Sequence, residues 1–209
     1  MAIRGNPVLD VRMTNNAIDR ALEATTNPRH RFMLQAYYRH RFLEIAGRYE
    51  EIFAPEMMTD NPVYHFMISG YNATLSGTEA VKGFYAAWAA SNQSIFYSEN
   101  EQVAVADNFI ASVVDQYQQT HGSQLIANGI DVDDENAYYL IKIPGMQMVW
   151  PYDDRGRLAG EDVWEPYPER RKVSKLEPSE VITTEQAREL LAPLIKPLPS
   201  FDVAMGSGA

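Results

Sequence analysis

The feature that most constrains this chain is one long helical pattern followed by a series of patterns typical of β-strands. Asn27 and Pro28 form a helix start, because asparagine caps free N–H groups and proline is tolerated in the first helical position. After them, apolar residues recur at steps of three or four: Leu34, Tyr38, Phe42, Ile45, Tyr49, Ile52 and Phe53. The pattern predicts a helix of about five or more turns that runs nearly to Pro55. A weaker helix is predicted before it, around Ile18.

Alternating and β-rich segments predict the strands that accompany this helix. The predicted strands are 58–68, 95–105, 109–121, 138–150 and 158–164. The second and third are separated by the short polar turn 106–108, so they should pair as an antiparallel hairpin. Pro144-Gly145 would suit a bulge or an edge within the fourth. Ser76-Gly77-Thr78-Glu79 has the form of a capping box and predicts a short helix between the first strand and the hairpin.

The length and the composition fit one domain with extensions. A chain of 209 residues with 45% hydrophobic content can bury one substantial core. We expect an arm with a short helix at 1–26, a domain at 27–167 and a proline-rich, charged extension at 168–209. The extension should contain one helix, from about Thr184 to Leu191, and wrap the domain or a neighbouring subunit; the final GSGA is predicted to be disordered. The fold class is α+β, with one curved sheet wrapped around a long helix.

Charge and residue types exclude several classes of function. The net charge of -10 opposes binding to nucleic acid. No run of about 18 apolar residues and no apolar signal segment occurs, so we expect a cytoplasmic protein without a membrane partner. Cysteine is absent, the four histidines have no ligand spacing, and the acidic loop 131–135 lacks the glycine and glutamate of a calcium loop. We therefore expect no metal and, because the sequence has no glycine-rich nucleotide loop, no cofactor.

Three segments in this order resemble a known family. They are RYEEIFAPEM followed by TDNPVYHF, then LSGTEAVKGFYAAW, then GMQMVWPYDDRGRLAGEDVW. Together, over about 29–167, they resemble the nuclear transport factor 2-like superfamily and its SnoaL-like branch. The resemblance implies a cone-shaped fold with a mostly apolar pocket at its open end. Members include polyketide cyclases, steroid isomerases, dehydratases and formaldehyde-releasing lyases, mostly without cofactors, and also non-catalytic binding and assembly modules. Pairing through the outer sheet face is common, which implies a homodimer or a higher homo-oligomer.

Asp115 is the first candidate for a catalytic group. On the strand 109–121 the odd positions are the more apolar, so we expect them to face the interior. A carboxylate there would lose solvation, which raises its pKa and suits it to carry protons at neutral pH. His121 and Tyr117 share this face, as a second acid-base group and a substrate contact. The alternatives are a solvated or arginine-paired Asp115, and a turn role for His121 before Gly122.

His65 and Tyr64 are alternative site residues, because they point to opposite faces of the strand 58–68. If His65 faces inward, it is available as a general acid or base; otherwise Tyr64 takes its place. Steroid isomerases carry an aspartate directly before the proline of this strand. Here Asn61 precedes Pro62, and Asp60 is one residue too early, which argues against that chemistry.

The long helix and the aromatic residues supply the remaining candidates. The resemblance implies that one margin of the helix looks into the cone. There Tyr37 or Tyr38 could donate to an oxyanion, and Arg41 could hold an anionic or phenolic group. For Tyr38 the alternative is plain core packing. Trp88 and Trp150 would form part of an apolar lining that suits a flat substrate.

These observations predict a cofactor-independent lyase, either a dehydratase or a formaldehyde-releasing enzyme, acting on a small aromatic or cyclic molecule. An isomerase or cyclase needs only a different destination for the proton. The rival from another class is a non-catalytic module that binds a ligand or a partner chain.

Overall fold

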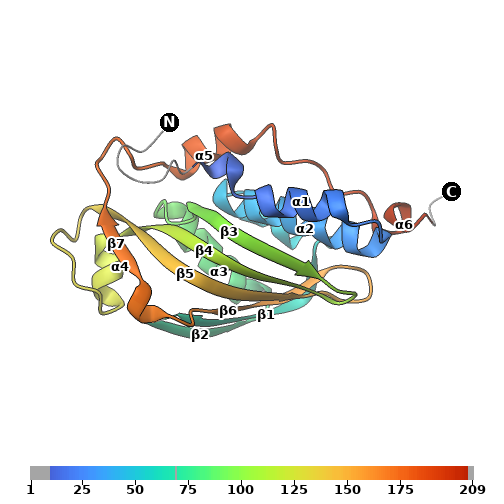
Figure 1. Ribbon diagram of the computed structural model, residues 1–209, viewed down its shortest axis with the longest axis horizontal. Coiled ribbons are helices and arrows are strands. Elements are labelled where there is room, and N and C mark those ends of the chain that lie inside the picture. Colours follow the sequence, from blue (N-terminus) through green and yellow to red (C-terminus); the bar gives the residue numbers. More distant parts are fainter. Residues whose placement is uncertain (1–9, 69, 207–209) are drawn as a thin grey trace.

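One curved sheet of seven strands forms the body of the protein (Figure 1). The computed structural model describes residues 10–68 and 70–206. The strands are β1 (Met58–Ile68), β2 (Tyr71–Ser76), β3 (Phe96–Val105), β4 (Phe109–His121), β5 (Tyr138–Pro151), β6 (Leu158–Trp164) and β7 (Lys172–Lys175). Their order is β2-β1-β6-β5-β4-β3, with β7 beside β5; β1 and β6 are parallel and the other pairs antiparallel. The predicted α+β class with a curved sheet is confirmed.

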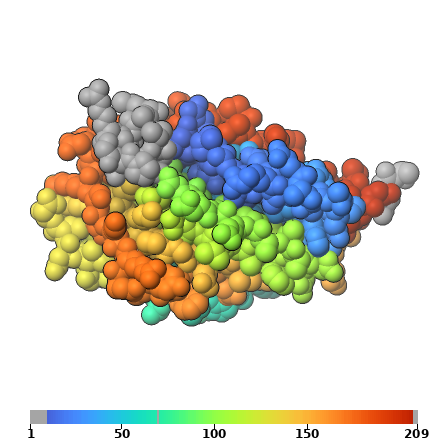
Figure 2. All heavy atoms as spheres, viewed as in Figure 1, coloured from blue at the N-terminus to red at the C-terminus, as the bar shows by residue number. Residues whose placement is uncertain are grey.

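The helices are α1 (Asn16–Ala24), α2 (Pro28–Ile45), α3 (Thr78–Ala90), α4 (Gly122–Ala127), α5 (Thr184–Leu191) and α6 (Phe201–Ala204). Short 3-10 turns add η1 (Val11–Met13), η2 (Tyr49–Phe53) and η3 (Pro168–Arg170). In the space-filling view, α1 (blue) lies directly against β3 (green) (Figure 2). None of the helices in the described part of the chain has both the length and the apolar character needed to cross a membrane.

Helix α2 begins as predicted but ends earlier. The Asn27 side chain accepts hydrogen bonds from the backbone N–H groups of Arg29 and His30. The helix ends at Ile45 because Gly47 adopts a left-handed φ of 61°, which turns the chain into η2. A Cβ on Gly47 would lie 2.4 Å from the Thr184 Cγ2 atom, so the extension packs tightly on this turn.

Helix α2 is covered on two sides. Tyr37 faces the sheet, where its ring lies 4.5 Å from that of Trp150. On the other side, Phe42 and Ile45 pack in a second apolar cluster with Leu191 of α5. The helix α5 has the predicted limits and begins with a capping box formed by Thr183 and Gln186. The extension then runs along the α1 and α2 side to α6, so it covers its own domain (Figure 1). Of the expected disordered end, residues 207–209 lie outside the described residues, as do residues 1–9 of the arm.

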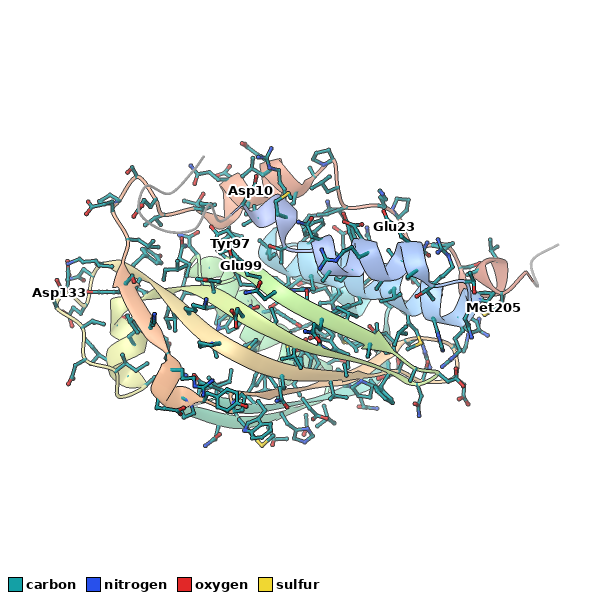
Figure 3. The ribbon with its side chains drawn as sticks, in the orientation of Figure 1. Asp10, Glu23, Tyr97, Glu99, Asp133 and Met205 are labelled. Atoms are coloured by element: carbon teal, nitrogen blue, oxygen red, sulfur yellow. The ribbon has the colours of Figure 1, made fainter. Side chains whose placement is uncertain are left out.

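Three local elements differ from the prediction. β2 pairs with β1 as a hairpin that the sequence pattern did not reveal. Ser76 is the last residue of β2, and Gly77 caps α3 without a side-chain hydrogen bond, so the predicted capping box is wrong. The short helix α4 follows β4 directly. In the acidic loop, Asp133 (labelled in Figure 3) and Asp134 form ion pairs with Lys175.

The predicted β3–β4 hairpin is confirmed, but the assignment of its faces is wrong. In the first half of β4 the buried residues are Ile110, Ser112 and Val114, and further on Gln116, Gln118 and Thr120 line the cavity, so the even positions face inward, although Tyr117 and Gln119 are also buried. The odd position Asp115 faces outward instead. Counting apolar residues misled here, because the outer face of β4 carries Phe109 and Val113, which are 40% and 46% exposed.

Two β-bulges in the neighbouring strands break their alternation. In β3, the register shifts between Glu99 (labelled in Figure 3) and Gln102. In β5, the two residues Pro144 and Gly145 lie opposite the single residue Asp115, so β5 has one extra residue. The predicted bulge at this pair is confirmed. Each bulge moves the following inward positions by one residue.

Gly160 of β6 provides a test of this packing. A Cβ there would lie 1.9 Å from the Val63 carbonyl oxygen, so Gly160→Ala should push β6 away from β1. We expect a loss of roughly 1–3 kcal/mol or more in the free energy of unfolding, measured by urea denaturation. Gly83→Ala is the matched control, because nothing lies within 4 Å of a Cβ there and the site is helical; it should be neutral or stabilising. Equal stabilities of the two variants would contradict the packing described.

Candidate functional site

A cavity of about 300 Å³ lies between the inner face of the sheet and the helices α2, α3 and α4. Its size lies at the lower end of the range for small-molecule sites, roughly 300–1,000 Å³. Its wall is mostly apolar and includes four charged side chains and several amides. The cavity is therefore the candidate site.

One wall of the cavity is aromatic. Phe66 of β1, Tyr71 of β2, and Phe84 and Trp88 of α3 lie in mutual contact along it. The ring centroids of Phe66 and Phe84 are 5.0 Å apart, and those of Phe84 and Trp88 are 4.4 Å apart. These rings form an extended surface that suits a flat apolar molecule.

The opposite wall comes from β5. Ile141 and Ile143 line it before the bulge, and Met146, Met148 and Trp150 line it after the bulge. The bulge explains this change from odd to even positions. The Trp150 side chain is buried, and its indole N–H finds no acceptor among residues 10–68 and 70–206. A buried donor without a partner is unfavourable, so a ligand oxygen in the cavity would stabilise it.

Two carboxyl groups lie in the wall of the same cavity. Glu44 comes from α2 and Glu161 from β6, and both are buried. Burial raises the pKa of Glu44 to about 8, although the charge of Arg41 acts in the opposite direction. Burial, and then the charge of Glu44, hold the pKa of Glu161 well above its usual range. The site can therefore keep a carboxylic acid protonated at neutral pH.

Arg41 lies beside these groups and is itself paired. Its side chain is 2% exposed, and one guanidinium nitrogen donates to both oxygens of Glu101, at 2.9 and 2.8 Å. The other terminal nitrogen donates to the Ser98 hydroxyl, which in turn donates to the Gln116 side chain. The ion pair neutralises most of the charge that Arg41 brings into the protein interior.

A chain of hydrogen bonds lies behind the cavity wall. The Tyr85 hydroxyl is 2.9 Å from His40 Nε2 and donates to the Tyr64 hydroxyl at 3.1 Å. Burial, and then the charge of Arg41, lower the pKa of His40 to about 3, so this histidine is neutral. His40 Nε2 is also 3.9 Å from Glu44. The chain thus fixes the rings next to the Glu44 carboxyl.

Uncharged polar side chains occupy another part of the wall. Gln116, Gln118 and Thr120 lie at alternate positions of β4, and Gln124 and Asn128 come from α4 and the residue after it. At the edge of the cavity, the Arg171 guanidinium forms a paired contact with the buried carboxylate of Glu165. A ligand would meet hydrogen-bonding amides here rather than isolated charges.

The structure brings some of the sequence-predicted residues to the cavity. Arg41, Trp88 and Trp150 line it. Tyr64 faces inward and joins the hydrogen-bond chain, as expected if His65 faces outward. Tyr37 is fully buried, packs on Trp150 and lies 3.4 Å from Glu101.

The other predicted residues lie elsewhere. The His65 side chain is 46% exposed and pairs with Asp162 on the outer face. Tyr38 packs on Phe42, as the core-packing alternative has it. His121 bonds to Ser123 beyond the cavity, and Tyr117 donates to Glu99. These positions do not line the cavity.

Asp115 also lies outside the cavity, on the outer face of the sheet. Its oxygens accept from the Asn100 side chain and the Gly145 N–H, and Lys142 Nζ is 3.4 Å away. Partial burial alone would raise the pKa of Asp115, but these hydrogen bonds and the lysine charge lower it. The expected raised pKa at this position is therefore wrong.

Sequence reasoning missed Glu44, Glu161 and Glu101. Glu44 had a signal, because Tyr37, Arg41 and Glu44 repeat at helical spacing and mark the cavity side of α2. Glu161 and Asp162 are adjacent acids on a strand, so one of them must face inward, but Trp164 favours the wrong face. Glu101 had no signal in the sequence, because only the bulge in β3 turns its side chain inward.

No protein-family model matches the chain, and no curated protein matches it. Similar solved structures include a candidate SnoaL-like polyketide cyclase from Jannaschia sp. CCS1, at 13% identity and a TM-score of 0.49, covering 67% of this chain and 89% of that one. An NTF2-like protein of unknown function from Cytophaga hutchinsonii ATCC 33406 matches at 12% identity and a TM-score of 0.41, over 62% and 95%. The epoxide hydrolase/cyclase-like enzyme SalBIII matches at 11% identity and a TM-score of 0.41, and the match covers 70% of this chain and 91% of that one. The first two neighbours bear names of the superfamily that the sequence resembles, and at such identities the likeness concerns the fold alone.

The two raised carboxyl pKa values predict how stability depends on pH. In the unfolded chain both groups titrate near ~4.3, so above this pH the folded protein binds more protons than the unfolded one. The free energy of unfolding should therefore fall as the pH rises from about 4.5 through about 8, by ~1.4 kcal/mol per pH unit for each group.

Glu44→Gln should flatten this decline, because glutamine does not titrate. Urea unfolding between pH 5 and 9 measures it, with Asp202→Asn, at an exposed acid of α6 paired with Arg155, as the control that should keep the wild-type slope. An unchanged slope in Glu44→Gln would contradict the raised pKa.

Proposed function

We propose that this protein is a cofactor-independent lyase that acts on a small aromatic or cyclic molecule in the cavity. The observation that carries the proposal is the pair of buried carboxyl groups, Glu44 and Glu161, in the wall of one mostly apolar cavity. Two acids in different environments can provide a base and an acid at the same pH. The resemblance to a family rich in such enzymes supports the same reading.

The proposed reaction is an elimination in which each carboxyl group has one role. The ionised Glu44 takes a proton from a carbon atom of the substrate, and the electron pair of that C–H bond forms a C=C bond. The C–O bond on the neighbouring carbon breaks, and the leaving oxygen takes the proton of Glu161 and departs as water. Glu44 ends protonated and Glu161 ionised, and transfer of one proton between them restores the starting state.

Neighbouring groups would support this transfer. Glu161 is suited to the acid because its pKa lies well above the usual range, whereas Glu44 titrates at about 8 beside Arg41. The free indole N–H of Trp150 would donate to a substrate oxygen on which negative charge develops. With a hydroxymethyl substituent, Glu44 would take the O–H proton and the C–C bond would break. Formaldehyde would leave, and the electron pair of that bond would form the C=C bond as water departs.

The same groups would serve an isomerase or a cyclase if the proton returned to another carbon atom or a ring closed. The alternative from another class is a ligand-binding or assembly module. One observation favours self-association in either case. The outer face of the sheet exposes Met67, Val113, Val149 and Trp164, which lie on four adjacent strands. We propose a homodimer or a higher homo-oligomer through this face.

The lyase is tested by incubating the protein with aromatic diols, hydroxy-steroids and lignin-type dimers and following product mass. We expect loss of water or formaldehyde, with a rate that rises with pH as Glu44 ionises near pH 8 and falls once Glu161 loses its proton. Glu161→Gln should lower kcat by about 100-fold or more, because glutamine cannot donate the proton.

His65→Ala is the matched control, because His65 lies on the outer face of the sheet. It should keep the wild-type rate. Turnover that survives in Glu161→Gln but is lost in His65→Ala would overturn the assignment. Ligand binding without any turnover would favour the non-catalytic module.

Self-association is tested by Trp164→Arg, which places a charge in the exposed apolar face of β6. We expect sedimentation velocity to show a smaller species than for the wild type, because burying an unpaired charge opposes association. Tyr167→Arg, at a 40% exposed residue beyond the strand, is the control that should leave the assembly unchanged. A wild type that sediments as a monomer would refute this part of the proposal.

A further inference from the structure

We propose that Asp115 is a positioning residue, which from the outer face of the sheet holds the two β-bulges that turn Glu101 and Trp150 inward. Asp115 lines no part of the cavity and touches no group in it. It lies between both bulges, however, and bonds to each. The proposal deepens the proposed function. Only the effect predicted for turnover rests on the proposed lyase activity.

The registers place Asp115 at the centre of both irregularities. On one side, Glu99 pairs with Asp115 and Gln102 with Val113, so β3 has one residue more than β4 between these pairs. On the other side, Val114 pairs with Met146 and Gln116 with Ile143, so β5 also has one residue more than β4. β4 is thus the regular strand between two bulged neighbours.

The carboxylate of Asp115 connects the two bulges. Its Oδ2 atom accepts from Asn100 Nδ2 at 3.1 Å, and its Oδ1 atom accepts from the Gly145 N–H at 3.0 Å. Both partners have left-handed backbones, with φ of 52° for Asn100 and 65° for Gly145. A residue other than glycine is strained in this region, so the bond to Asn100 helps to hold a conformation that costs free energy.

The first bulge decides where Glu101 points. Phe96 and Ser98 face the interior, so strict alternation would send Glu101 outward. The extra residue in β3 reverses the parity, and the Glu101 side chain meets Arg41 with 2% of its surface exposed. Without the bulge, Arg41 would remain charged and unpaired beside Glu44 and Glu161.

The second bulge decides where Trp150 points. Ile141 and Ile143 line the cavity from odd positions, whereas Met148 and Trp150 line it from even ones. The extra residue at Pro144-Gly145 causes this switch. Without it, the indole would lie on the outer face, and the cavity would lose both an apolar wall and its free donor.

Asp115→Asn tests the proposal by NMR, without a substrate. Asparagine keeps the size, but its single carbonyl oxygen accepts only in place of one of the two carboxylate oxygens, and its NH₂ group faces the donors of Asn100 and Lys142. We expect the Trp150 indole N–H resonance and the midpoint of the Glu161 carboxyl titration to shift. In the lyase assay, a displacement of about 1 Å would lower kcat by up to roughly 100-fold.

Two further variants distinguish an effect on the bulges from the effect of removing a charge and from a general loss of stability. Asp107→Asn removes another carboxylate, which lies in the turn between β3 and β4, is paired with His30 and is next to no bulge, and it should leave both signals in place. Asn100→Gly keeps the left-handed backbone but removes the bond to Asp115. It should shift the Arg41 guanidinium and Glu161 signals and leave that of Trp150 unchanged.

The proposal is overturned if folded Asp115→Asn keeps the Trp150 and Glu161 signals of the wild type, whether or not the variant loses stability. If Asp115→Asn does not fold, Asn100→Gly decides, and unchanged Arg41 and Glu161 signals overturn the proposal. Shifted signals in a protein without lyase activity would support the positioning role and count against the proposed function alone.

Discussion

The buried ion pair between Arg41 and Glu101 is the interaction on which the interior of this protein depends. A guanidinium next to an apolar cavity is strongly unfavourable unless a counter-charge and hydrogen bonds accompany it. Glu101 and Ser98 provide both, and both come from one strand, β3. The pair therefore fixes the distance and the rotation of α2 relative to the sheet. Because Glu44 lies one turn further along α2, the same contact sets where this carboxyl meets the cavity.

The unusual acidity of the site follows from this arrangement. Glu101 satisfies Arg41, so the arginine compensates only part of the desolvation of Glu44 and Glu161. A free arginine would have lowered both pKa values and left two ordinary carboxylates. The neutral His40 adds no positive charge, since its ring is buried and lies near Arg41. Glu44 and Glu161 therefore stay protonated because they are buried without a full counter-charge, and no special group is needed.

The sequence predicted the elements of the fold better than the directions of its side chains. The limits of β1, β4 and α5 and the start of α2 follow from local signals that need no tertiary information, such as the Asn27-Pro28 cap. β2 and α4 lack such signals and depend on the neighbours they pack against. The inward face of β4 was misassigned because an exposed apolar outer face imitates a core. The inward direction of the Glu101 side chain could not be predicted, since one extra residue in a strand moves every later side chain to the opposite face.

The strand β4, which carries no extra residue of its own, bears on how this protein can change. Its inward polar positions, Gln116, Gln118 and Thr120, contact the cavity, while the register of the sheet is set by irregularities in β3 and β5. Ligand contacts and sheet register are therefore set at different positions: the inward face of β4 contacts the cavity, and the bulges lie in β3 and β5. Single substitutions at Gln118 or Thr120 would change the ligand preference without disturbing the bulges that keep Glu101 and the indole in place.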